Sequence, residues 1–583
     1  MQRAVSPVRL TPALLVPLFP MAAALGCVPV DDGAPSGPCP SLFVGGEPDS
    51  PIEVGRRALA EALESTGVQV CPWLFSADTD EGRAQLAARP DMALDPRPES
   101  YAIVPSAVGP TVIGRDATGT MYGALELAER IRLGREAAVL FAAPVHGAPA
   151  VPIRGANLFL VLPADGERDW WFHDERFWRE YLDLLARSRM NFLDLHAMYN
   201  TRNTVFPNAL LWFATSPSFP DVGMPAPERA RNLATLKRVV EMAAARGIRV
   251  AFMSYRADPS HHGDMQDFPL DEAELKRYTR EAVADLARKV PGLWRLGFRI
   301  GESLRQDPNW YTDTFLAGLR DSGTGVLPYT RSWQIEKKDM LALLSRSGAD
   351  FLVEAKLNGE QLGAPYAIQG GAFANHPWGG PTGIYSYQDY LDPPTPYTFI
   401  FQVRTCSTHR MFRYASYERT RRTIASLTLG GSRGFTLEAP HAFYPQRDFY
   451  HAPEDRFSDW TFRRDELMYL LFGRLAYDPA TPEAAFREAL AARTGNAALW
   501  DAMQAASDIV PWMQMAMTCG PDTRDYAPDL EWGGTVAEWA SPAHSTPGQC
   551  NYRAPFDTFA VASPAEAAAD LLAGRPTSRV SPV

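Results

Sequence analysis

The chain has 583 residues, 46% of them hydrophobic and 21% charged, so it is a globular protein too long for a single ordinary core. The formal net charge of −11 at pH 7 argues against a nucleic-acid-binding protein, which normally carries a basic patch. The 14 tryptophans and 21 tyrosines suit sugar stacking but equally suit a large core.

The first 27 residues have the pattern of a secretory signal. Arg3 and Arg9 precede the apolar residues 10–25, a run that is short, broken by prolines and followed by small residues. A small residue directly before Cys27 resembles the bacterial lipoprotein lipobox, although Ala24 stands where Leu is usual. We therefore expect export with a lipid on Cys27, and cleavage without lipidation is the alternative. No other segment approaches the roughly 20 apolar residues of a membrane span.

Two segments follow the signal. Residues 28–50 are rich in Pro, Gly, Asp and Ser, as expected of a linker. Residues 51–149 predict a small α/β domain. Its expected elements are an amphipathic helix over 53–65, strands over 101–104 and 111–114, and a second helix over 119–132.

Strand-like and helix-like segments alternate regularly over residues 150–445. The strand-like segments are 155–162, 192–198, 248–255, 293–300, 326–333, 350–356, 397–404 and 434–439. Amphipathic helices are expected over 174–188, 227–246, 271–290, 310–321, 336–347 and 417–429, whereas residues 357–396 contain no convincing helix. Eight strands with crossover helices predict a parallel (β/α)8 TIM barrel. A doubly wound open sheet is the alternative, but it usually has fewer strands and a phosphate-binding glycine turn, which this sequence lacks.

Residues 446–583 predict a mostly helical C-terminal region, with helices over 465–476, 482–494, 498–505 and 563–573. The final residues look like a turn that opens another helix, which suggests that this region is incomplete. The expected fold class is thus α/β: a small N-terminal α/β domain, a TIM barrel and a helical C-terminal region.

Five cysteines remain after Cys27, and an exported protein can form disulfides. The pairs that lie within one expected domain are Cys39–Cys71 and Cys519–Cys550, which leaves Cys406 free. We expect the bond between Cys519 and Cys550 to tie a loop-rich segment. The spacing fits no zinc site.

Three glutamates lie at the C-terminal ends of predicted barrel strands, where barrel enzymes keep their functional groups. Glu302 follows the fourth strand, Glu354 lies near the end of the sixth, and Glu438 ends the eighth. Glycoside hydrolysis needs two carboxyl groups, a proton donor and a nucleophile or base. Many barrel glycosidases keep their acid after the fourth strand, so we assign that role to Glu302, with Glu438 or Glu354 as its partner. Salt bridges to neighbouring cations are the alternative role of each glutamate.

Other strand-end side chains suit the binding of a polar, ring-shaped ligand. Those expected to bind substrate are Asn157, His196, Arg299, Arg331, Trp333, Lys356, Arg404 and His409. Four of them are cations from the fourth to seventh strands, and a guanidinium can grip a carboxylate through two hydrogen bonds. The pattern therefore indicates a negatively charged substrate, most simply a uronic acid. Alternatively, these cations neutralise the three glutamates.

Two other kinds of chemistry are less well supported. Asp258, His261, His262 and Asp264 lie together after the third strand, but the H-x-H pattern of metallohydrolase barrels is absent from the first strand. A G-x-S-x-G nucleophile elbow is also absent. We expect neither a catalytic metal nor another cofactor.

Residues 151–155 (VPIRG) and 177–191 (FWREYLDLLARSRMN) carry a family resemblance. The chain resembles glycosidases in which an arginine-glycine entry starts the barrel and a helix ending in (K/R)-x-N leads to the second strand. These are the β-hexosaminidases of glycoside hydrolase family 20 and, more closely, the α-glucuronidases of family 67. Residues 114–125 (GRDATGTMYGAL) are similar to the end of their small α/β domain.

The resemblance covers residues 50–445 and implies an N-terminal α/β domain, a TIM barrel and a glutamate acid, which maps to Glu302. Gly301 precedes Glu302, so the adjacent Asp-Glu pair of family 20 is missing. Substrate-assisted hexosaminidase chemistry is therefore not implied. Glu354 and Glu438 are assigned by strand position and not by a motif.

Together these observations predict an exported glycosidase, α-glucuronidase-like, that acts on an oligo- or polysaccharide by a two-carboxylate mechanism. We expect no nucleic-acid partner, and contact with a membrane only through an N-terminal lipid. The alternatives are a polysaccharide lyase, which would use a Tyr, His or Lys base, and a surface glycan-binding lipoprotein with a degenerate barrel.

Overall fold

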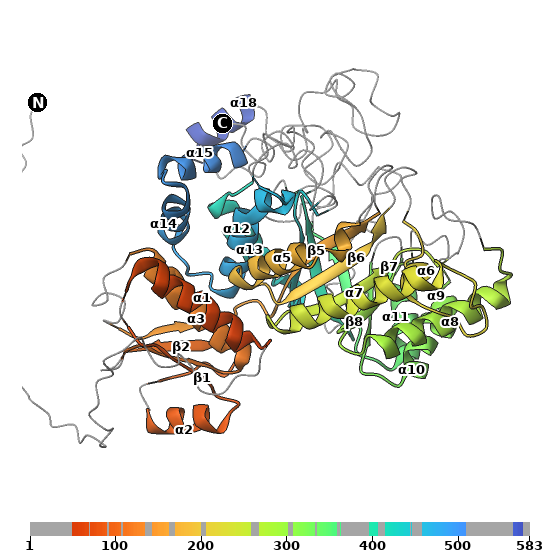
Figure 1. The fold of residues 1–583 in the computed structure, drawn as a ribbon. Coiled ribbons are helices and arrows are strands. Elements are labelled where there is room, and N and C mark those ends of the chain that lie inside the picture. Colours follow the sequence, from red (N-terminus) through yellow and green to blue (C-terminus); the bar gives the residue numbers. More distant parts are fainter. Residues whose placement is uncertain are drawn as a thin grey trace, which may run out of the picture. The chain divides into compact units, whose positions relative to one another are not determined.

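The computed structural model describes residues 49–574 except for 69, 90–91, 106–108, 135–142, 163–169, 200–205, 258–267, 301–306, 333–334, 358–361, 363–395, 406–413, 443–444, 446–457 and 509–563. The described part contains a four-stranded sheet with its helices, a closed barrel and further C-terminal helices (Figure 1).

The four-stranded sheet has the order β1-β3-β2-β4. Its strands are β1 (Trp73–Ser76), β2 (Tyr101–Val104), β3 (Thr111–Gly114) and β4 (Val145–Gly147). Helices α1 (Pro51–Thr66) and α3 (Ala117–Arg132) cover one face, and α2 (Asp80–Ala88) lies on the other (Figure 1). Apolar side chains of α1 and α3 bury this face of the sheet, which stabilises the domain through the hydrophobic effect.

The predicted elements of this sheet domain are confirmed, and three further elements were missed. β4 has only three residues, too few to display an alternating pattern, whereas β1 has four residues, the same length as the predicted β2 and β3. In α2 only Gly82 is buried, so the helix shows no apolar stripe. A threonine cap marks its start, because the Thr79 side chain accepts a hydrogen bond from the Gly82 N–H.

Eight parallel strands close the barrel in the order β10-β11-β12-β5-β6-β7-β8-β9, as predicted. They are β5 (Ile153–Val161), β6 (Phe192–Tyr199), β7 (Arg249–Ser254), β8 (Arg295–Phe298), β9 (Leu327–Arg331), β10 (Leu352–Lys356), β11 (Thr398–Arg404) and β12 (Gly434–Glu438). Each begins and ends within four residues of its predicted bounds. The (β/α)8 fold class is therefore confirmed.

Helices surround this barrel. They are α5 (Glu175–Arg187), α6 (Leu210–Phe213), α7 (Ala226–Ala244), α8 (Glu272–Lys289), α9 (Pro308–Tyr311), α10 (Ala317–Ser322), α11 (Lys337–Ser347) and α12 (Tyr417–Ser426). A π-helical segment, Thr312–Leu316, joins α9 to α10, where the sequence predicted one helix. The residues between β10 and β11 lie almost entirely outside the described part.

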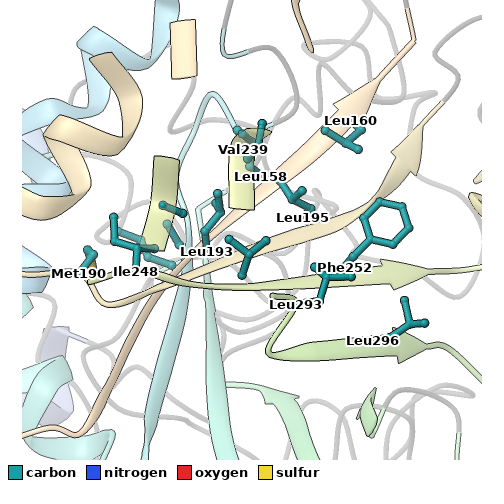
Figure 2. Close-up of a cluster of buried hydrophobic side chains, with 14 of the residues drawn as sticks. Leu158, Leu160, Met190, Leu193, Leu195, Val239, Ile248, Phe252, Leu293 and Leu296 are labelled. Carbon is teal, nitrogen blue, oxygen red and sulfur yellow. The ribbon is translucent and has the colours of Figure 1, made fainter. Parts of the chain in front are cut away.

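Alternation along the strands divides the side chains into two sets, because successive residues point to opposite faces of a sheet. One set faces the helices and is apolar; Figure 2 shows Leu158, Leu193, Leu195 and Phe252 of this set packed in one cluster with Val239 of α7. The other set fills the barrel interior. It is apolar toward the N-terminal ends of the strands and polar toward their C-terminal ends.

The N-terminal end of the barrel is closed by an aromatic and cationic plug. The Trp294 ring lies edge to face with Phe192 at 5.1 Å between centroids. Arg249 and Arg295 lie over the same indole at 4.0 and 4.7 Å from its centroid. Such cation–π contacts stabilise side chains that have lost part of their hydration.

Helix α13 (Glu466–Tyr477), which the sequence analysis assigned to the C-terminal region, follows the last barrel strand and contacts α12, α5 and β5. Phe472 packs against Phe435 of β12 at 6.0 Å between ring centroids. The Tyr469 hydroxyl lies 3.0 Å from that of Tyr181 on α5. In the structure α13 thus takes the place of the helix that follows the eighth strand of a (β/α)8 barrel.

The remaining described helices are α14 (Glu483–Thr494), α15 (Ala498–Ser507) and α18 (Pro564–Leu572), as predicted. Trp500 of α15 is buried, and its Nε1–H donates to Glu483 at the start of α14. Within the described residues, no helix has the length and apolar character needed to cross a membrane.

Candidate active site

Polar side chains fill the C-terminal half of the barrel in layers. In a (β/α)8 barrel, each interior layer takes its side chains from alternate strands. The deepest polar layer contains Asp194 of β6, Glu354 of β10 and Thr436 of β12, all buried. The Thr436 hydroxyl donates a hydrogen bond to Glu354 Oε1, so these two side chains meet across the barrel interior.

The middle layer comes from the other set of strands and consists of Asn157 of β5, Arg331 of β9 and Gln402 of β11. Arg331 donates to Gln402 Oε1. The Gln402 Nε2 group donates to Asn157 Oδ1 over 3.1 Å. All three side chains are buried.

The upper layer lies nearest the barrel mouth. Its side chains are His196, Arg299, Lys356 and Glu438. Each comes two residues after the position that β6, β8, β10 or β12 contributes to the deepest polar layer. Two residues of strand correspond to a rise of roughly 6.6 Å. Glu438 is therefore closer to the mouth than Glu354, which lies in the deepest polar layer with its partner Thr436.

The middle layer and two neighbours form a closed ring of hydrogen bonds. Arg331 donates a hydrogen bond to His196 Nε2 over 3.0 Å, and His196 Nδ1 forms a hydrogen bond with Asp194 Oδ2. Asn157 Nδ2 also donates to Asp194 Oδ2, over 2.8 Å. Because an arginine can only donate, His196 Nε2 is the acceptor and its proton lies on Nδ1. Arg331 thus fixes the tautomer of His196 and, through Gln402, closes the ring.

The surroundings of His196 are strongly positive. Burial lowers the pKa of His196 well below its ordinary value, and the charges of Arg331, Arg299, Arg404 and Lys356 lower it further. His196 is therefore neutral at physiological pH. The four cations that the sequence singled out lie close enough to act on this one imidazole.

Asp194 behaves differently from an ordinary aspartate. Burial raises its pKa well above the usual range, and the nearby Glu354 charge raises it further. Tyr329 and Asn157 oppose this effect by donating to Asp194 Oδ2, over 3.0 and 2.8 Å. Among the described residues, Asp194 Oδ1 has no hydrogen-bond partner, so this oxygen is the place for a proton.

Two carboxylates of the candidate site, Glu438 and Glu354, pair with arginines. Arg404 donates to Glu438 Oε1 over 2.7 Å. Arg331 Nε lies 3.1 Å from Glu354 Oε2, but the geometry is that of an ion pair and not of a hydrogen bond. Arg299 instead lies over the Tyr255 ring, 4.2 Å from its centroid. Among the described residues, Arg331 and Arg404 thus pair with glutamates, as the alternative interpretation expected.

Asp194, His196 and Glu354 offer ligand atoms that lie within 4.8 Å of one another, a spacing that could hold a metal ion. The charges argue against it. Arg331 contacts both His196 and Glu354, and three further cations act on the same imidazole. A divalent cation would be repelled by these groups.

Several residues singled out from the sequence lie outside the described part. They are Glu302, Trp333, His409, Cys27, Cys39, Cys406, Cys519, Cys550 and the Asp258–Asp264 cluster. Cys71 is disulfide-bonded. Asn157 and His196, which we expected to bind substrate, are fully buried, and their polar side-chain atoms contact protein groups.

The sequence analysis missed Asp194, Tyr329, Gln402 and Thr436. Each stands at an interior position of its strand, two residues from another interior polar side chain or from the strand end. Alternation within each predicted strand would have identified them as interior polar residues, a class that is rare without function.

The sequence matches no protein-family model and no curated protein. Among solved structures, a GH138 enzyme targeting pectin rhamnogalacturonan II has a TM-score of 0.63 at 19% identity, over 82% of this chain and 56% of that chain. A family 20 β-N-acetylglucosaminidase has a TM-score of 0.44 at 15% identity, over 80% of this chain and 93% of that chain. The chain therefore spans just over half the length of the GH138 enzyme and shares with it the barrel fold.

Proposed function

We propose that this chain is a glycoside hydrolase that uses Glu302 as the acid and Glu438 as the second carboxyl group. Glu438 and Glu354 are both buried, and the observation that carries the proposal is the position of Glu438 in the upper layer, nearer the barrel mouth than Glu354. Glu354 is a weaker candidate, because it lies in the deepest polar layer against Thr436 and Arg331.

The strand order supports this choice of partner. Glu302 follows β8 and Glu438 ends β12, and these two strands are four apart in an eight-stranded barrel. Side chains from opposite strands can flank a sugar ring from both sides. One carboxyl group then protonates the leaving oxygen while the other attacks or activates water. The barrel likeness to the GH138 enzyme agrees with this proposal.

The finer proposal is that the substrate carries a uronic acid, as in the resemblance to α-glucuronidases. Arg299 and Lys356 lie in the same layer as Glu438, and their charges act on His196. A sugar carboxylate would be attracted by this positive field and held by charge-assisted hydrogen bonds. We also propose that the chain is exported and lipidated at Cys27, which metabolic labelling with an alkyne fatty acid would detect.

The test is a panel of paired 4-nitrophenyl hexosides and hexuronides in both anomeric forms, with pectic oligosaccharides as natural substrates. We expect release of a reducing sugar and a loss of about 10²–10⁴-fold in turnover for Glu302→Gln and for Glu438→Gln. Thr405→Val, which removes the hydroxyl that contacts the Glu438 backbone oxygen and the Met468 sulfur but leaves the Glu438 carboxylate untouched, is the control. An unsaturated sugar product would identify a lyase, and binding without turnover would identify a glycan-binding protein.

A further inference from the structure

We propose that Gln402 is a positioning residue that orients the Glu438 carboxylate, and that Arg331 sets the orientation of the Gln402 amide. The inference rests on the proposed function and adds a residue to it. Gln402 is fully buried and contacts Glu438 directly, below the level at which a substrate would lie.

The orientation of the Gln402 amide follows from its partners. Arg331 carries only donors, so the Gln402 atom that it contacts is the carbonyl oxygen Oε1. The Nε2 group then faces the opposite way, 3.1 Å from Asn157 Oδ1 and 3.1 Å from Glu438 Oε2. Its two protons satisfy these two acceptors.

The rest of the ring prevents the amide from turning over. Asn157 is held with its Nδ2 group toward Asp194 Oδ2, so its oxygen must face Gln402. A flipped Gln402 would direct Nε2 at the Arg331 guanidinium and its oxygen at two other oxygens. Three hydrogen bonds would be lost in a buried site, where unmade hydrogen bonds are costly.

Glu438 is consequently held at both oxygens. Arg404 donates to Oε1 over 2.7 Å and Gln402 donates to Oε2 over 3.1 Å. These two hydrogen bonds fix the direction of the carboxylate, which a nucleophile or a general base requires.

Substitutions at Gln402 separate these effects. Gln402→Glu keeps the size and the contact with Arg331 but replaces the donor with a second carboxylate beside Glu438. A like charge disfavours ionisation, so the acid limb of the kcat/KM profile should rise by about 1–3 pH units. Gln402→Met removes the donor without adding a charge and should raise the acid limb by less.

The experiment compares pH profiles of kcat/KM on the 4-nitrophenyl glycoside cleaved fastest, for the full chain, Gln402→Glu, Gln402→Met and the control Thr405→Val. We expect the acid limb to rise in the order wild type, Met, Glu, and Thr405→Val to keep the wild-type limb. High pH should restore most of the rate of Gln402→Glu. Gln402→Asn, which withdraws the amide by one methylene, is used if Gln402→Glu does not fold, and it should lower kcat at unchanged KM.

The two proposals fail in different ways. The role of Gln402 would be overturned if the acid limb of Gln402→Glu lay at the wild-type pH, or if Gln402→Asn kept the wild-type kcat. In either case an inactive Glu438→Gln would leave the glycosidase assignment intact. An active Glu438→Gln would instead remove Glu438 from catalysis. Circular dichroism of each variant establishes that a changed profile does not come from unfolding.

Discussion

The side chain of Glu126, which is 13% exposed, joins the four-stranded sheet domain to the barrel, and its substitution gives a quantitative test. Glu126 of α3 accepts a hydrogen bond from Arg130 over 2.9 Å and pairs with Arg474 of α13 at 3.0 Å. Arg189, just past α5, lies 3.6 Å from the same carboxylate. Burial alone would raise the pKa of Glu126, but the charges of Arg474, Arg189 and Arg130 lower it to about 2.

The lowered pKa sets the magnitude. The ordinary value is 4.5, so the difference from about 2 is about 2.5 pH units. At about 1.36 kcal/mol for each pH unit, the ionised form of Glu126 contributes about 3 kcal/mol to the free energy of unfolding. A carboxyl group with a lowered folded pKa stabilises above its unfolded pKa, and this contribution is lost as the pH falls from 4.5 toward 2.

Glu126→Gln mimics the protonated side chain and should lower the free energy of unfolding by about 3 kcal/mol at pH 7. Urea unfolding followed by circular dichroism at pH 7, 5 and 3 measures this difference, which should shrink at pH 3. Glu61→Gln is the control, because the exposed Glu61–Arg132 pair is 3.6 Å apart and should contribute less than about 1 kcal/mol. A difference that stays constant from pH 7 to pH 3 would refute the electrostatic argument.

Three further predictions concern the barrel interior. Glu354→Gln should destabilise the fold by about 3–5 kcal/mol, because it breaks the buried ion pair with Arg331. The same variant should lose less turnover than Glu438→Gln, and thermal unfolding and kcat on one substrate measure the two effects. Arg299→Met should lower kcat/KM about 100-fold on a 4-nitrophenyl hexuronide and much less on the matched hexoside, and equal losses would return Arg299 to a structural role. Because the pKa of His196 is lowered in the folded state, the unfolded chain binds an extra proton below about pH 6.5, and the free energy of unfolding should decrease as the pH falls below this value. His196→Gln should lose this dependence in unfolding curves at pH 7 and 5.

Most of the architecture is predictable from patterns in the amino-acid sequence. Apolar strands separated by amphipathic helices specified the barrel, because a parallel sheet buried on both faces needs apolar strands and covering helices. The sequence also placed Glu438, Arg299, Lys356 and Arg404 near the C-terminal ends of strands, where the structure has them. Local sequence patterns contain this information, because the alternation of a strand and the residues at its end can be recognised from neighbours along the chain.

The division of these residues among layers depends on contacts between segments that lie far apart in the sequence. Gln402 contacts Asn157, 245 residues away, and Arg331 contacts His196, 135 residues away. Such contacts depend on strand order and register around the closed barrel, which place side chains from alternate strands at one height. They put Glu354 in the deepest polar layer and Glu438 in the upper one, a distinction that strand position in the sequence left open. They also revealed Asp194 and Gln402, because the chemistry of a buried polar group is set by the partners that the fold brings to it.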